Sequence, residues 1–155
     1  MNTRISHVPC ERPITSSQAW LNVGQVMSRA VLAVSSHETV LAATRSMAEK
    51  NVSCIVVTDH GSPVGILTET DLLRRVAQNE NDFDTIPVSG IMSSPLETIG
   101  PGTSVFEASR IMEEKQIKRL PVVEAKELVG IITQTDLVRV LTSYCVWADV
   151  RRIMN

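Results

Sequence analysis

The feature that most constrains this chain is an internal repeat with a fixed spacing. Residues 23–76 and 88–141 align without a gap, and 18 of the 54 aligned pairs are identical. The same spacing of 65 positions separates Met47 from Met112. A period this long indicates one duplicated supersecondary unit, because the units of a solenoid are shorter. The fold must therefore be built from two similar halves, which we call copy one and copy two.

Each copy reads as a β-α-β-β-α unit that follows a short helical turn. In copy one, Val40, Ala43 and Met47 have the three-then-four spacing that places apolar residues on one helix face, and copy two repeats it. We expect Thr39 to cap the first helix and Ser104 with Glu107 to form a capping box on the second. The expected helical turns are 23–28 and 88–93, and the expected extended segments are 31–34, 54–58, 64–68, 96–99, 120–123 and 128–133.

The most regular part of the repeat is a seven-residue stretch, 65–71 in copy one and 130–136 in copy two. A glycine opens a short apolar run, which we interpret as a buried strand, and a Thr-x-x-Asp step follows. This step is typical of a helix start, with Thr68 or Thr133 as N-cap and Asp71 or Asp136 three residues on. Such a start can bind phosphate at its unpaired N–H groups and sugar hydroxyls at its carboxylate. Helix capping alone would also explain both residues.

Composition excludes several other classes of protein. A net charge of −2 gives no support to a nucleic-acid surface. No apolar run approaches the roughly 20 residues that span a bilayer, and the polar N-terminus has no signal-peptide core. Three widely spaced cysteines predict a reducing compartment, and hence the cytoplasm. The cysteines and histidines lack the spacing of a metal site or a nucleophile pair, so we predict neither a metal nor catalytic residues; they are Cys10, Cys54, Cys145, His7, His37 and His60.

The order of these motifs resembles a known family. Met-Ser, the helix with Ala-x-x-x-Met, Ile-Lys-Arg-Leu-Pro-Val at 117–122 and Gly-Ile-Ile-Thr-Gln-Thr-Asp-Leu at 130–137 resemble the cystathionine β-synthase (CBS) domain. The chain is similar to a tandem pair of them, a Bateman module. The resemblance implies an α/β (α+β) fold in which two β-α-β-β-α repeats pack with pseudo-two-fold symmetry. The expected divisions are an N-terminal extension (1–20), repeat 1 (21–79), a linker (80–86), repeat 2 (87–143) and a C-terminal helical extension (144–155).

The resemblance also implies a function, which is regulation rather than catalysis. Family members bind adenosyl ligands in the clefts between their repeats, here AMP, ADP, ATP or S-adenosylmethionine as candidates, and are usually dimeric, so a homodimer is expected. No cofactor is implied as obligatory. The family's ribose-binding acids fall on Asp71 and Asp136, its phosphate-contacting hydroxyls on Thr68 and Thr133, its basic phosphate contacts on Lys118 and Arg119, and its adenine contacts near Ala30, Val31, Pro95 and Leu96.

The two copies differ in the residues that would face a phosphate. Ser53 and Cys54 stand in copy one where copy two has Lys118 and Arg119, and Glu69 stands where copy two has Gln134. We therefore expect the helix start in copy two to prefer anionic nucleotides, unless the basic pair reaches across to the other copy. A second interpretation is a ligand-free dimerisation module in which both Asp residues only cap helices.

Overall fold

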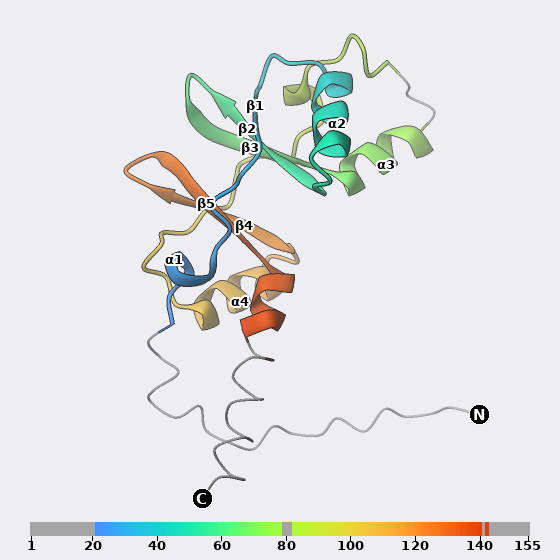
Figure 1. Ribbon diagram of the computed structural model, residues 1–155. Coiled ribbons are helices and arrows are strands. Elements are labelled where there is room, and N and C mark those ends of the chain that lie inside the picture. Colours follow the sequence, from blue (N-terminus) through green and yellow to red (C-terminus); the bar gives the residue numbers. More distant parts are fainter. Residues whose placement is uncertain (1–20, 79–81, 141, 143–155) are drawn as a thin grey trace, which may run out of the picture.

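The protein is described by a computed structural model that defines residues 21–78, 82–140 and 142 of the 155-residue chain (Figure 1). The predicted extensions at both ends lie outside these residues, and so do His7, Cys10, Cys145 and part of the predicted linker. Within the described parts, the chain forms two lobes, each with its own small sheet. The predicted mixed α/β class with two similar halves is therefore confirmed.

The upper lobe in Figure 1 contains most of copy one. Its sheet has three strands in the order β1-β2-β3. Strand β1 pairs parallel to β2, and β2 pairs antiparallel to β3. The turn between β2 and β3 carries positive φ angles at His60 and Gly61. The elements of copy one, of which α1 lies in the other lobe, are α1 (Val23–Val26), β1 (Ala33–Ser35), α2 (Val40–Glu49), β2 (Cys54–Asp59), β3 (Ser62–Thr68) and α3 (Glu69–Ala77).

The lower lobe contains most of copy two. Its sheet has two antiparallel strands, and the chain is helical again over residues 134–140, directly after the second sheet strand. The elements of copy two, of which η2 lies in the upper lobe, are the 3-10 helix η2 (Val88–Gly90), α4 (Val105–Glu114), β4 (Arg119–Glu124) and β5 (Glu127–Thr133). All four expected hairpin strands are therefore present, and each is longer than expected.

The expected extended segment at 96–99 does not form a strand. It makes a single bridge, in which Ile99 N donates to Pro121 O and Val123 N donates to Ile99 O. In copy one the ladder continues because Ser36 N donates to Thr58 O at 2.8 Å. The position that corresponds to Ser36 is Pro101, which has no N–H to donate. On the other side of the bridge, Val56 N donates to Leu32 O in copy one at 2.9 Å, and the residue that corresponds to Val56 is Pro121, which also has no N–H. The two missing donors together explain why only copy one has a third strand.

Helix capping follows the sequence with one exception. Thr39 Oγ1 accepts from Ala42 N at 3.2 Å, and Ser104 Oγ accepts from Glu107 N at 3.0 Å. The capping box expected at Ser104 is wrong in its second half, because the Glu107 carboxylate binds Arg110 instead, at 2.6 and 3.0 Å. This bond, with the charge of Arg110, lowers the pKa of Glu107.

The first helix of each copy packs in the lobe of the other copy. Val23 of α1 is fully buried against Ala108 and Met112 in the copy-two core, and Val23 N donates to Thr103 O at 2.8 Å. Val88 of η2 is likewise buried in the copy-one core. Figure 1 shows α1 in the lower lobe beside α4, far from the rest of copy one. The lobes are therefore built by exchange, and neither is made from one copy alone.

The glycine that opens each repeated stretch is required by this exchange. A Cβ at Gly130 would collide with the Met27 side chain and lie 3.0 Å from Ser28 O, and a Cβ at Gly65 would collide with Met92. At these glycines, β3 and β5 thus receive the exchanged segment at close range. Among the described residues, the structure holds no helix both long and apolar enough to cross a membrane.

Candidate functional site

The Thr-x-x-Asp step of copy one forms a closed capping box at the N-terminus of α3. Thr68 N and Thr68 Oγ1 donate to Asp71 Oδ2 at 2.9 and 2.6 Å, and Asp71 N donates to Thr68 Oγ1 at 3.3 Å. The other carboxylate oxygen, Oδ1, lies 3.5 Å from Ser93 Oγ and 3.9 Å from an Arg74 nitrogen. We call Thr68, Asp71 and Ser93 site A.

The same geometry recurs at the helix that begins at residue 134. Thr133 N and Oγ1 donate to Asp136 Oδ2 at 2.9 and 2.7 Å, and Arg139 lies 3.6 Å from Asp136 Oδ1. The Asp136 side chain is 18% exposed, against 10% for Asp71. We call Thr133, Asp136 and Ser28, the counterpart of Ser93, site B. In both sites one carboxylate oxygen is used in capping, and the second lies near an exposed arginine of the same helix.

Each site is assembled from both copies. Ser93 N donates to Ile66 O at 2.8 Å and Ile66 N returns a bond at 3.1 Å, so the segment leading to Pro95 and Leu96 lies against β3. Ser28 and Ile131 exchange the equivalent bonds, both at 2.9 Å, which brings the segment leading to Ala30 and Val31 against β5. The four predicted adenine contacts thus lie on the chain segments beside sites A and B, and their roles stay predictions.

Arg119 lies at the start of β4 in copy two, yet its side chain reaches copy one. Arg119 Nη1 donates to Ser53 O at 2.8 Å, and the same oxygen accepts from Glu69 N, the first residue of α3, at 3.2 Å. The guanidinium therefore lies at the helix start of site A. The expectation that Lys118 and Arg119 both serve the helix start of copy two is wrong for Arg119. Its side chain instead reaches across to copy one, which was the stated alternative.

Cys54 occupies the position that corresponds to Arg119 and is packed beside it. Burial raises the pKa of the Cys54 thiol, and the neighbouring Arg119 charge and hydrogen bond only partly offset this effect. The thiol is thus neutral at physiological pH and does not cancel the positive charge of Arg119. Nothing in the sequence spacing indicates this contact, because the two residues belong to different copies.

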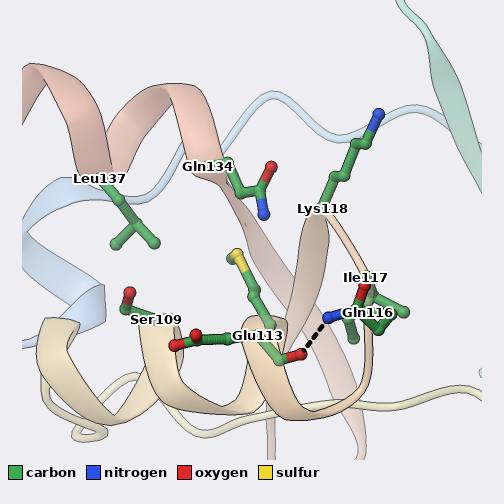
Figure 2. A pocket seen from close by; sticks show the side chains of 8 residues that line it. Ser109, Glu113, Gln116, Ile117, Lys118, Gln134 and Leu137 are labelled. Atoms are coloured by element: carbon green, nitrogen blue, oxygen red, sulfur yellow. Dashed lines mark hydrogen bonds between the residues drawn. The ribbon is translucent and has the colours of Figure 1, made fainter. Parts of the chain in front are cut away.

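A pocket of about 330 Å³ lies between α4 and the helix that begins at residue 134 (Figure 2). Its floor includes the buried side chains of Met112 and Leu137. Of the predicted site residues only Lys118 lines it, and Figure 2 shows the Lys118 amine extending away from the other side chains. No motif in the sequence indicated this pocket, whose other lining residues are Ser109, Glu113, Gln116, Ile117 and Gln134.

Metal ligands do not gather anywhere in residues 21–78 and 82–140. No group of three His, Cys, Asp or Glu side chains in this part of the chain could hold an ion. His37 lies 3.7 Å from Asp59, and both are exposed on the upper lobe away from the Thr-x-x-Asp steps.

Comparison with known proteins places both copies in one family. The CBS domain matches residues 23–78 and 88–143. The CBS domain-containing protein YhcV of Bacillus subtilis is 37% identical over 116 residues, which cover 75% of this chain and 82% of YhcV. An uncharacterized protein of Methanocaldococcus jannaschii is 32% identical over 130 residues, or 76% of this chain. The match spans only 31% of that longer relative.

Solved structures share the fold. The CBS domain pair of protein MJ0100, solved in complex with 5′-methylthioadenosine and S-adenosyl-L-methionine, has a TM-score of 0.72 at 25% identity. The alignment covers 79% of this chain and 97% of that one. A hexameric CBS-CP12 protein from bloom-forming cyanobacteria has a TM-score of 0.70 at 32% identity, with 76% and 70% coverage.

Proposed function

Because the chain belongs to the CBS domain family as a tandem pair, we propose that it is a regulatory module that senses an adenosyl ligand. The candidates are AMP, ADP, ATP and S-adenosylmethionine, bound at sites A and B, with the signal passed to a partner or attached domain. The observation that carries the proposal is the duplicated capping geometry of Thr68–Asp71 and Thr133–Asp136. The complex of MJ0100 with two adenosyl compounds supports it.

The chemistry of each site suits a nucleoside. We expect Asp71 Oδ1 and Asp136 Oδ1 to accept from ribose hydroxyls, while Oδ2 holds the threonine in place. The dipole of each helix would favour the negative charge of a phosphate at its first turn. The role is regulatory rather than catalytic in this proposal, and the wide spacing of the three cysteines supports a location in the reducing cytoplasm.

The proposal predicts stabilisation by one of the candidate ligands. A ligand at a hundredfold excess over its Kd should raise the free energy of unfolding by about 2.7 kcal/mol, seen as a higher melting temperature in a thermal shift panel. Replacing both Asp71 and Asp136 with alanine should remove the shift. The matched control is Asp84→Ala, an exposed carboxylate outside both sites. A panel in which none of the four compounds shifts the wild type contradicts the proposal.

The second part of the proposal is that the chain forms a homodimer. If sites A and B bind no ligand, dimerisation itself is the alternative function. Leu73 on α3 is 68% exposed, and Val138, its counterpart in copy two, is 57% exposed. Phe106 on α4 is 67% exposed. Large apolar side chains at equivalent positions of two symmetry-related helices suit a second copy of the chain with two-fold symmetry.

Sedimentation velocity tests this assembly. We expect the mass of a dimer at tens of micromolar, and we expect Leu73→Asp with Val138→Asp to give monomers because carboxylates would be buried in the contact. The exposed substitution Glu49→Asp serves as the control. A strict monomer with and without nucleotide would rule out the homodimer, and a hexamer would place this chain with the cyanobacterial neighbour instead.

A further inference from the structure

Sites A and B share a backbone geometry but differ in the one cation that is held in place. Resting on the proposed function, we propose that Arg119 makes site A the site for a phosphate-bearing adenosyl ligand, while site B takes an adenosyl ligand without a phosphate. Arg119 belongs to copy two and serves the helix start of copy one. It is thus a specificity-determining residue supplied across the boundary between the copies.

The position of the guanidinium follows from a shared acceptor. Ser53 O accepts both Arg119 Nη1 at 2.8 Å and Glu69 N at 3.2 Å, so the cation lies beside the first N–H of α3. A guanidinium carries five N–H donors, of which this bond uses one. Its planar fork matches two phosphate oxygens at once, which makes the pairing both strong and directional. In the first turn of α3, Glu69 N and Asp71 N already donate to Ser53 O and Thr68 Oγ1, so a phosphate there would meet Thr70 N together with the Arg119 cation.

Site B has no counterpart to this cation. The acceptor that corresponds to Ser53 O is Lys118 O, which accepts from Gln134 N at 2.9 Å. The residue that corresponds to Arg119 is Cys54, which is short and uncharged. A ligand at site B would thus meet the backbone donors and Asp136, which suit the sugar of an uncharged nucleoside.

Three other charges oppose this assignment, and all are exposed. Glu69 adds a carboxylate near site A, whereas Lys118 and Arg29, which directly follows Ser28, add cations near site B. Exposed charges that no bond holds are screened by water and salt and contribute little to a specific contact. The bond from Arg119 to Ser53 O is itself exposed, but Arg119 is partly buried and the bond holds its charge at one place. The held cation should therefore decide the preference over the three other charges.

Calorimetry with AMP and adenosine, which differ only by the phosphate, tests the assignment. Arg119→Met should weaken AMP binding by about tenfold or more, as expected for a lost charge-assisted hydrogen bond, and leave adenosine binding within about twofold. Lys126→Met, which removes the charge of an exposed lysine in the turn between β4 and β5, is the matched control and should change neither. Lys118→Met removes the other predicted phosphate contact and should weaken AMP binding less than Arg119→Met does. Arg119→Lys keeps a cation without the fork and should fall between wild type and Arg119→Met. The melting temperature of each unliganded variant reports whether it folds.

The outcomes separate this inference from the proposed function. Loss of AMP binding in Asp71→Ala but not in Asp136→Ala supports the assignment to site A. The inference is overturned if the wild type binds AMP and Lys118→Met weakens it more than Arg119→Met does, or if neither changes it, while the proposed function stands. It is also overturned alone if the wild type binds adenosine and rejects AMP. A wild type that binds no adenosyl compound overturns both.

Discussion

Replacing Met112 with alanine is expected to lower the free energy of unfolding by about 2–5 kcal/mol. Met112 is 1% exposed and packs in the lower core with Leu120 and Ile132. Truncation removes buried apolar atoms and leaves a cavity that the neighbouring strands can only partly fill. A urea titration that follows helical circular dichroism measures the change, with the slope of the transition checked for two-state behaviour.

The control lies on the same helix. Phe106→Ala removes a larger side chain, but Phe106 is 67% exposed, so we expect a change within about 0.5 kcal/mol in the monomer. The equivalent core residue of the upper lobe is Met47, 3% exposed, and Met47→Ala should cost about as much as Met112→Ala. A loss below about 1 kcal/mol at Met112 would show that the core is not packed as described.

An even larger loss is expected from Val23→Asp. Val23 has no exposed surface and lies in the lower core between the faces of α4 and β5, although it belongs to copy one. A carboxylate there would have no partner, and we expect a loss of about 4 kcal/mol or more. Hydrogen exchange should locate the damage in β4 and β5 and not in the sheet of copy one.

Gln25→Glu is the matched control for this substitution. It adds a carboxylate to the same short helix at an exposed position, and its side-chain oxygen can still accept from Asn22 N as Gln25 Oε1 does at 2.9 Å. We expect little change in stability. If Val23→Asp instead loosened the amides of β2 and β3 first, the exchange of helices between the lobes would be refuted.

The repeat and its apolar spacing were sufficient to predict most of the helices and strands of each copy. Helix α2 begins at Val40 and α4 at Val105, as the caps Thr39 and Ser104 indicated. Capping is a local interaction, so a window of a few residues contains its cause. The predicted third strand of copy two is absent because Pro101 and Pro121 each remove a donor that copy one supplies. Both prolines are visible in the sequence, but the symmetry of the repeat suggested the same strands in both copies.

The long-range contacts could not be predicted. The identity of an apolar residue such as Val23 does not indicate in which of the two cores it packs, because both cores contain the same kinds of side chain. The same holds for Arg119, whose side chain is long enough to reach either helix start. Sequence therefore indicated the chemistry of the sites, whereas the pairing of residues across the copies needed the fold.

The exchanged helices bear on how such a protein can arise. A chain with one copy would have a first helix with no core of its own to fill, and two such chains could satisfy each other only as a closed two-fold pair. Fusing the two genes in tandem keeps every one of those contacts within a single chain. It also lifts a constraint, since identical subunits must carry identical residues. Only the fused form can evolve different residues at corresponding positions of the two copies, such as Cys54 and Arg119, or Ser36 and Pro101.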